Sequence, residues 1–411
     1  MSVVQTNNKI SWSFVVCTML LAAFYFFPQM RILITYDQLA YLSTLYYVCF
    51  IMKTEPLSKL VNIMKYTLPY CILIYIAKGF SFKYGFMLNF MTLWNLLIPS
   101  IICIGILSRN RTKELQIITW STIVMIVATC IVTLGEMSLT ANVMRELTAG
   151  TTDETYAMKL RKNGVGGFGV AYSMGAFAVG LFVLLKQIPR ENKIWWVILS
   201  LTFFIVYFIT QAQFATLLIL TIVGIVSYYF LKAKTTNKKM AIIGYTIAII
   251  VAMPYIFQTL ISLYSDTTVG ARLDRMYESL WGSGELTEVS GSRSVQQLDA
   301  FYLFLQSPFW GNNITGIKNA SIYLACHSTM LAVAAATGII GIWSYIKSFK
   351  TAFDRQIDAI IDPSLKSCYY PIVLYYLLFA IFNPIDGFPE APWVIFVVIP
   401  SLYKLYGLRN K

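Results

Sequence analysis

Long runs of apolar residues, separated by short charged segments, recur along the whole chain. Each run is close to the length of about 20 residues that an α-helix needs to cross a lipid bilayer. The pattern therefore predicts an all-α polytopic membrane protein with about twelve transmembrane helices. The predicted spans cover residues 10–28, 33–52, 58–77, 85–107, 116–135, 167–185, 194–211, 214–231, 240–263, 324–346, 369–385 and 391–408.

The composition agrees with this pattern. Of the 411 residues, 57% are hydrophobic and 12% are charged, whereas soluble domains carry roughly 25% charged residues. A soluble globular protein is therefore excluded. The first apolar run lacks a small-residue cleavage site and is followed by further spans, so we expect it to be a retained helix and not a signal peptide.

The net charge of +13 is explained by topology. With the N-terminus inside, 20 of the 32 Lys and Arg residues fall on cytoplasmic segments, 11 fall on outer segments, and Lys65 lies within the third span. Basic residues are retained in the cytoplasm, so both termini are expected to be cytoplasmic. A nucleic-acid partner is not expected, because nucleic-acid-binding proteins concentrate basic residues on one face of an otherwise ordinary composition.

Two outer segments, 136–166 and 264–323, are long and polar within a single transmembrane domain that covers residues 1–411. Loops of this length are usually functional or disordered. The second segment contains two stretches with apolar residues at spacings of three and four, which is typical of amphipathic helices. We expect two short helices at the outer membrane surface, the second ending at Pro308. Their apolar positions are Leu273, Met276 and Leu280 in the first stretch and Val295, Leu298, Phe301, Tyr302 and Leu305 in the second.

Four arginines on the outer side are candidates for phosphate binding, because guanidinium groups bind phosphate oxygens in a bidentate manner. They are Arg161, Arg272, Arg275 and Arg293. An outward cavity that holds such groups would suit a lipid-linked diphosphate. For each single arginine the alternative is a solvated loop balanced by nearby acidic residues. A fifth outer arginine, Arg31, lies close enough to Asp37 along the chain to pair with it.

His327 is the only histidine in the chain and falls at the outer start of the tenth predicted span. A neutral imidazole accepts a proton at neutral pH, so this residue is the candidate base for a hydroxyl acceptor; the alternative is a structural role at a helix end. The sequence has no Gly-rich phosphate loop or dinucleotide-binding fingerprint. It also lacks the clustered outer carboxylates or histidines of a metal site. We therefore expect neither a cofactor nor a metal ion.

Residues 291–341 carry several motifs in a fixed order. These are Gly291-Ser292-Arg293, the second amphipathic stretch, Ser307-Pro308-Phe309-Trp310-Gly311, and His327 at the start of a helix that carries Gly338 and Gly341. This order resembles the signature of the O-antigen polymerase and ligase superfamily. Two positions differ from that signature. Asn312 follows Gly311 where many members have Gly-x-Gly, and Gln213 stands in a hairpin where many members have Ser-Arg. The phosphate contact of that arginine would then come from Gln213 or from another basic residue.

The resemblance implies a lipid-dependent, metal-independent glycosyltransferase of the C-type (GT-C) fold in the bacterial plasma membrane. Such an enzyme polymerises undecaprenyl-diphosphate-linked oligosaccharide repeat units into O-antigen, the polysaccharide of lipopolysaccharide, or into capsular polysaccharide. The reaction takes place at the outer face, with membrane lipid and a chain-length regulator protein as further partners. The implied site residues are His327 and Arg293 as catalytic groups and Arg161, Arg272, Arg275 and Gln213 as diphosphate or substrate ligands.

Two alternative functions remain open at the level of sequence. Within the same superfamily, a ligase transfers finished chains to a lipid A core; it holds the same donor group and differs in the acceptor. A flippase or transporter for the lipid-linked sugar belongs to another class. Transporters are commonly built from structural repeats with polar sites at the membrane midplane, and the sequence shows neither feature. We favour a polymerase over a ligase because polymerases are the more numerous and divergent branch and the chain lacks the Ser-Arg.

Overall fold

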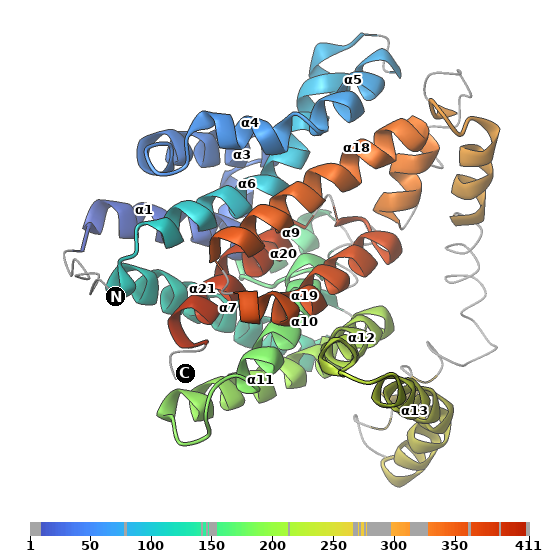
Figure 1. Ribbon diagram of the computed structural model, residues 1–411. Helices are drawn as coiled ribbons and strands as arrows, with labels where there is room; N and C mark the ends of the chain where they lie inside the picture. Colours follow the sequence, from blue (N-terminus) through green and yellow to red (C-terminus); the bar gives the residue numbers. More distant parts are fainter. Residues whose placement is uncertain are drawn as a thin grey trace.

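The computed structural model describes residues 10–77, 80–140, 143–144, 147, 154–212, 214–265, 270, 273–274, 277, 297–312, 328–360, 363–385 and 388–407. Within these residues the regular elements are helices, and no strand is present (Figure 1). The first group of elements is α1 (Trp12–Phe26), α2 (Met30–Leu33), α3 (Tyr36–Tyr46), η1 (Tyr47–Ile51), α4 (Leu57–Met64), α5 (Thr67–Ala77), η2 (Phe82–Met87), α6 (Leu88–Ser108) and α7 (Thr112–Leu139). The second group is α9 (Glu154–Lys162), α10 (Phe168–Leu185), α11 (Lys193–Ala212), α12 (Ala215–Lys232), α13 (Thr236–Leu263), α18 (Thr329–Ile360), α19 (Pro363–Phe382), α20 (Glu390–Trp393), η4 (Val394–Val398) and α21 (Ile399–Tyr406).

Many of these helices have the length and composition of membrane spans. Six of the described helices are long and apolar enough to cross a bilayer, namely α6, α7, α10, α11, α13 and α18, and the shorter helices α1, α5, α12 and α19 are also apolar. The chain is therefore a polytopic membrane protein. Each of the twelve predicted spans overlaps at least one helix, while the count of twelve spans and the GT-C fold stay predictions.

The third predicted span, 58–77, departs from expectation because it is divided into α4 and α5. Lys65 was expected inside one continuous helix, but it lies exposed at the end of α4. Its amine donates to Asn62 Oδ1 at 3.1 Å and lies 5.0 Å from the centroid of the Tyr66 ring. An ammonium group is costly to hold in an apolar environment, and the break leaves it at the surface.

Helix α18 continues to Ile360, beyond the predicted end at residue 346. Polar residues end the apolar run in the sequence, but Phe349, Phe353 and Ile357 are buried at a spacing of four residues. This spacing gives the extension one apolar face. Lys350 and Asp354 pair on another part of the surface. The apolar stripe explains why the helix outlasts the hydrophobic run.

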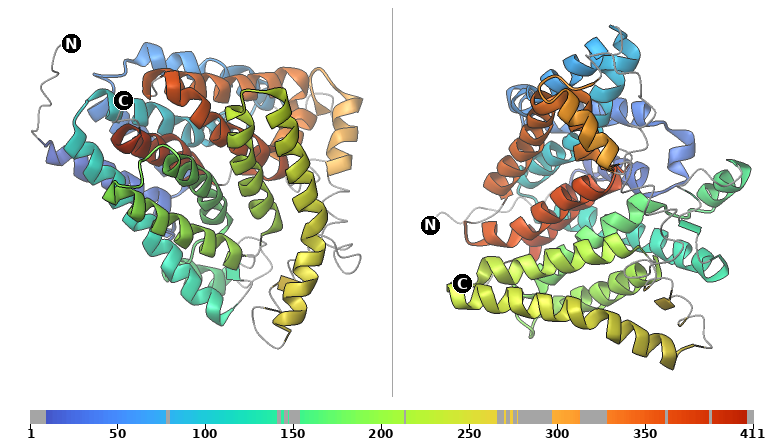
Figure 2. Two further views of the ribbon diagram at one scale, coloured as in Figure 1. Left: turned by 60° about the horizontal axis from the view of Figure 1, so that its bottom comes forward. Right: turned by 90° about the vertical axis from the view of Figure 1, so that its right-hand side faces the viewer.

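The core lies around α6 and α10, in which 89% and 83% of the apolar stretch is buried. Helix α18 packs against α5 and α6, and α12 and α19 pack against each other and against α10 (Figures 1 and 2). The elements α20, η4 and α21 contact both α6 and α10 and so join the two groups. A small residue permits the close approach of α19 to α10, since a Cβ on Gly175 would lie 2.2 Å from the Tyr375 hydroxyl.

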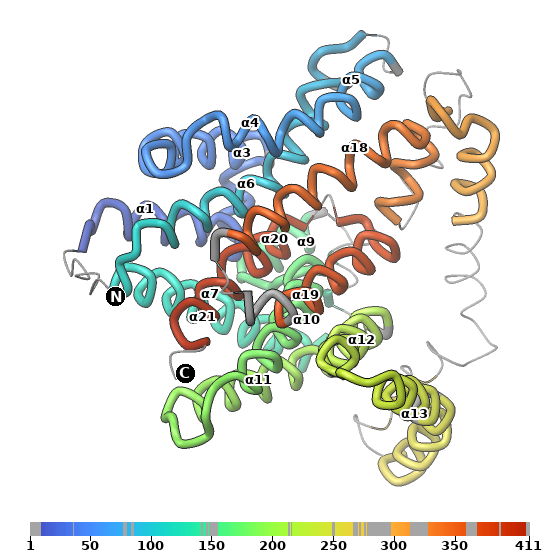
Figure 3. Tube along the Cα trace, viewed as in Figure 1, coloured from blue at the N-terminus to red at the C-terminus, as the bar shows by residue number. Residues whose placement is uncertain are grey.

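Both ends of the described chain meet the first part of α7 (Figure 3). The backbone N–H of Ser11 donates to Glu114 at 2.6 Å, and the indole N–H of Trp120 donates to the Tyr406 hydroxyl at 2.8 Å. The two ends therefore lie on the same side of the bundle. The expectation that this side is cytoplasmic stays a prediction.

A helix is present at residues 297–306, within the second predicted amphipathic stretch, and it ends before Pro308. Ala300, Leu303 and Phe304 face the beginning of α18, where Ala335 is buried against them. Val295 lies outside the described residues, and the other residues predicted to form the apolar face point away from the protein: Leu298, Phe301, Tyr302 and Leu305 are all more than two-fifths exposed. This face is free to contact lipid, as the proposed location at the membrane surface requires.

Candidate functional site

A cavity of about 260 Å³ lies where the end of α1 meets the beginnings of α3, α10 and α20. All of these chain segments were assigned to the outer side from the sequence, and the structure brings them together at one end of the bundle. The cavity is lined mainly by apolar and aromatic side chains, with a few polar groups. Its lining residues are Phe24, Pro28, Arg31, Ile34, Thr35, Leu39, Leu147, Arg161, Val165, Gly167, Phe168, Gly169, Val170, Phe388 and Glu390. This mixture is typical of ligand sites.

Arg31 is fixed in the cavity wall by two contacts. Its Nη2 atom lies 2.7 Å from Glu390 Oε1 and also donates to the backbone carbonyl of Tyr25 at 2.7 Å. Tyr25 belongs to the last turn of α1, where carbonyl groups lack partners within the helix, and a cation there interacts favourably with the helix dipole. Arg31 therefore caps α1 and joins it to the segment that begins α20.

Glu390 is almost fully buried, with 3% of its side chain exposed. Its Oε1 pairs with Arg31, whereas Oε2 has no hydrogen-bond partner among the described residues. Oε2 lies against the first turn of α10, because a Cβ on Gly169 would be 2.4 Å from it. The absence of a side chain at Gly169 makes room for the carboxylate, and the positive end of the helix dipole stabilises its charge. Oε2 is one of several buried side-chain atoms that have no hydrogen-bond partner among the described residues.

Arg161 supplies a second guanidinium to the cavity. It lies in the last turn of α9, which packs against α2 and so comes close to Arg31. Gly164 ends this helical segment in the left-handed conformation, with φ of 86°, and turns the chain toward α10. Within the described part of the chain Arg161 forms no ion pair and remains exposed. With Arg31 and Glu390 it gives the cavity a formal charge of +1, which favours an anionic ligand.

The two halves of the sequence motif contact each other. The backbone N–H of Ile339 donates to the carbonyl of Pro308 at 2.7 Å. Gly338 and Gly311 both have positive φ, of 63° and 77°. A Cβ on Gly338 would lie 2.4 Å from the carbonyl of Phe309, and one on Gly311 would lie 2.0 Å from the carbonyl of Ala336. Only glycine fits these positions. The Pro-Phe-Trp-Gly turn therefore packs closely against α18 at Gly338, where the helix is kinked.

The beginning of α18 is tied to the segment that leads into the cavity. The backbone N–H of Thr329 donates to the carbonyl of Asn383 at 3.3 Å, and Thr329 Oγ1 accepts from the N–H of Ile385 at 2.8 Å. A few residues later the same segment supplies Phe388 and Glu390 to the cavity wall. The residue that follows His327 along the chain, Ser328, is fully buried. The start of α18 and the cavity thus belong to one end of the molecule.

Of the site residues predicted from the sequence, Arg161 lies in the cavity wall. His327, Arg293, Arg272, Arg275 and Gln213 lie outside the described residues. The structure gives Arg31 a different partner from the expected Asp37, because Glu390 is brought to it by the packing of α20 against α1. Sequence reasoning missed Glu390. The signal that identifies it is an acidic residue placed directly before an apolar run, where it becomes buried.

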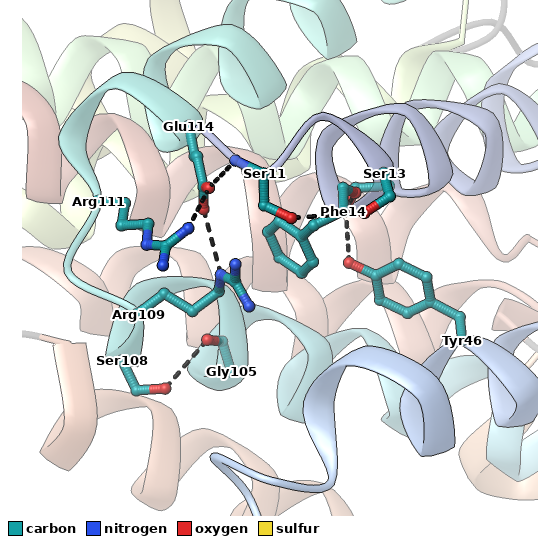
Figure 4. Close-up of polar contacts among 10 residues, drawn as sticks. Ser11, Ser13, Phe14, Tyr46, Gly105, Ser108, Arg109, Arg111 and Glu114 are labelled. Atoms are coloured by element: carbon teal, nitrogen blue, oxygen red, sulfur yellow. Dashed lines mark hydrogen bonds and ion pairs between the residues drawn. The ribbon is translucent and has the colours of Figure 1, made fainter. Parts of the chain in front are cut away.

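A second charged cluster lies at the opposite end of α1 (Figure 4). Glu114 Oε1 accepts from the N–H of Ser11 at 2.6 Å and from Arg111 Nη1 at 2.8 Å, and Oε2 accepts from Arg109 Nε at 3.1 Å. The guanidinium of Arg109 also lies 3.9 Å from the centroid of the Phe14 ring. Both carboxylate oxygens have partners, so this cluster has the character of a structural joint between α1, α6 and α7.

In sequence comparisons the chain matches no model of a known protein family, and no curated protein shows significant similarity to it. Among the residues that the structure describes, no three His, Cys, Asp or Glu side chains are close enough together to hold a metal ion. The described cavity places the guanidinium groups of Arg31 and Arg161 in a largely apolar, aromatic setting.

Proposed function

We propose that the chain is a polysaccharide polymerase that joins undecaprenyl-diphosphate-linked oligosaccharide repeat units at the outer face of the plasma membrane by metal-independent glycosyl transfer. The observation that carries this proposal is the contact between Pro308 and Ile339, with its two obligatory glycines, Gly311 and Gly338. These residues belong to the two halves of the motif that resembles the superfamily signature. Their mutual fit supports treating the motif as one functional unit and not as a chance match.

The cavity supports a role for Arg161 in holding the diphosphate of the donor lipid. A guanidinium group without an ion-pair partner in the described chain, next to a second one held by Glu390, provides paired N–H groups for phosphate oxygens. Arg31 extends the set of phosphate ligands beyond those expected from the sequence. Glu390 keeps Arg31 in place and prevents it from turning away when the cavity is empty of ligand.

In the proposed reaction a hydroxyl of the acceptor sugar attacks the anomeric carbon of the donor. The new glycosidic bond forms as the bond between that carbon and the diphosphate oxygen breaks, and undecaprenyl diphosphate leaves with the electron pair. His327 takes the hydroxyl proton, and Arg293, with Arg161, Arg272, Arg275 and Gln213 as further ligands, stabilises the departing charge. A single displacement inverts the configuration at the anomeric carbon.

The exposed apolar face of the helix at 297–306 supports the placement of this reaction at a membrane surface. Leu298, Phe301, Tyr302 and Leu305 point away from the protein, while the other face packs on α18 next to the motif contact. A helix held in this way keeps the motif close to the lipid tail of the donor. It also limits the access of water, so that transfer competes well with hydrolysis.

The experiment that tests this function uses the purified full-length protein and a lipid-linked single repeat unit as both donor and acceptor. A polymerase converts the single repeat into a series of longer lipid-linked products. If the single repeat is unchanged but long chains are transferred to added lipid A core, the protein is a ligase. If neither transfer occurs and the lipid moves between the leaflets of a vesicle, the protein is a transporter, and the proposed function is wrong.

A further inference from the structure

A second cavity, of about 230 Å³, lies between α12 and α13 and shares no lining residue with the first. It forms an open groove, because α13 packs mainly against α12 and only 6% of its apolar stretch is buried. Figures 1 and 2 show α13 at the edge of the bundle beside α12. The groove is lined by Val223, Val226, Ser227, Phe230, Ile242, Ile243, Thr246 and Ile247.

The walls of the groove offer almost no hydrogen-bonding groups. Its two hydroxyl side chains are both satisfied within their own helices: Ser227 donates to the carbonyl of Gly224 at 2.7 Å, and Thr246 donates to the carbonyl of Ile242 at 2.7 Å. The remaining lining side chains are aliphatic or aromatic. A polar ligand would lose its hydrogen bonds to water here without replacement, whereas a hydrocarbon chain would not.

One end of the groove is strongly basic. The loop between α12 and α13 and the adjoining helix turns carry Lys232, Lys234, Lys238 and Lys239. The sequence has no acidic residue between Glu191 and Asp266, and none of the four lysines forms an ion pair within the described part of the chain. The amine of Lys239 lies 5.3 Å from the ring centroid of Phe230, which is itself a groove residue. The positive charge therefore stands at the mouth of the apolar groove.

We propose that this groove binds an anionic diacyl phospholipid, with an acyl chain between α12 and α13 and the phosphate against the lysine cluster. Basic clusters at the ends of membrane helices, and basic pockets between such helices, bind anionic headgroups. The combination of a hydrocarbon groove and four lysines without an ion pair among the described residues matches both parts of such a lipid. A second copy of the chain fits less well, because a symmetric contact would bring the same four lysines together. The site is independent of the proposed polymerase activity.

The test uses the full-length protein in a neutral detergent, with dioleoyl phosphatidylglycerol as the anionic probe and dioleoyl phosphatidylethanolamine as the zwitterionic one. The two lipids have the same acyl chains and differ in headgroup charge. Native mass spectrometry measures the lipid retained per protein molecule. We expect phosphatidylglycerol to be retained about tenfold more than phosphatidylethanolamine at low salt, with a smaller preference at high salt because the charges are screened.

Two variants separate the contributions of charge and groove. Replacing all four lysines by glutamine removes the headgroup contact, and Thr246→Phe fills the groove while leaving the lysines in place; both should lose the preference. The matched control, Lys186→Gln with Lys193→Gln, removes two exposed lysines from the neighbouring α10–α11 loop and should keep it. Equal retention of the two lipids by the unaltered protein would overturn the proposal, as would an unchanged preference in either the four-lysine variant or Thr246→Phe.

Discussion

Two buried carboxylates lie at opposite ends of α1 and differ in how completely they are satisfied. Glu114 and Glu390 each have 3% of the side chain exposed. Glu114 uses both oxygens to accept from Ser11, Arg109 and Arg111. Glu390 pairs with Arg31 through one oxygen, and the other has no hydrogen-bond partner in the described chain.

The difference bears on where the proposed substrate site lies. A carboxylate with both oxygens bonded completes a joint between helices and has little left to offer to another molecule. At the other end, Glu390 holds Arg31 in the wall of a cavity that Arg161 also lines, and Arg161 forms no ion pair within the described chain. Glu114 therefore has the contacts of a structural joint, and the substrate binding that we propose falls at the Glu390 end.

The largest effect is expected from removal of the proposed base, His327. His327→Ala, expressed in a polymerase-null strain, should reduce the formation of long-chain polysaccharide by about 10²- to 10⁴-fold, because proton transfer by a positioned side chain contributes that much. Protein abundance should not change. Arg293→Ala is to be tested separately in the same strain. Full-length polysaccharide chains made by the His327 variant would show that His327 is not the catalytic base.

Glu114→Gln should cause a large loss of stability and little loss of activity per folded molecule. The substitution leaves Arg109 and Arg111 without their carboxylate and places an amide N–H among donors. Breaking such a buried pair costs about 3 kcal/mol, the low end of the usual range because both arginines are partly exposed. Thermal unfolding of the purified protein measures this effect. An unchanged unfolding temperature would contradict the structural role.

Arg161→Gln should lower activity without lowering stability. Loss of one donor that stabilises developing charge typically reduces the rate about 10²-fold, and the side chain makes no ion pair in the described structure that folding would miss. Lys159→Gln, a neighbour on the same helix that is absent from the cavity lining, is the matched control. Equal loss of activity in both variants would indicate a general charge effect and not a specific contact.

Glu390→Gln is expected to destabilise the protein less than Glu114→Gln. The amide carbonyl can still accept from Arg31, so the substitution loses the charge of one ion pair, whereas Glu114→Gln loses that of two. The free energy of unfolding should therefore fall by about 1.5 kcal/mol, about half the change for Glu114→Gln. Thermal unfolding of the two variants side by side makes the comparison. Equal destabilisation would show that the two carboxylates are equivalent structural joints.

The sequence predicts the local features of this fold well. Hydrophobic runs locate a helix in each of twelve expected spans, and spacings of three and four locate the helix at 297–306. The errors in the predicted helix bounds occur where the local pattern is ambiguous. The break at Lys65 and the extension of α18 to Ile360 both occur where polar residues interrupt an apolar run, and packing against neighbouring helices decides whether the helix continues.

The candidate site was predictable only in part, because its contacts join residues far apart in the chain. Charge and position single out Arg161, which lines the cavity. The pairing of Arg31 with Glu390 depends on the packing of α20 against α1, which no sequence period reports. The contact of Pro308 with Ile339 also depends on tertiary packing, although the motif order led us to expect both segments in one functional unit.

The most direct test of the central claim measures elongation of a lipid-linked single repeat unit by purified protein, with the variants Arg161→Gln and Glu114→Gln compared per folded molecule. The account predicts a series of longer products from the unaltered protein, a nearly complete loss of that series in Arg161→Gln, and its retention in the folded fraction of Glu114→Gln. Unchanged elongation by Arg161→Gln, together with its loss in folded Glu114→Gln, would contradict the assignment of substrate binding to the Glu390 end.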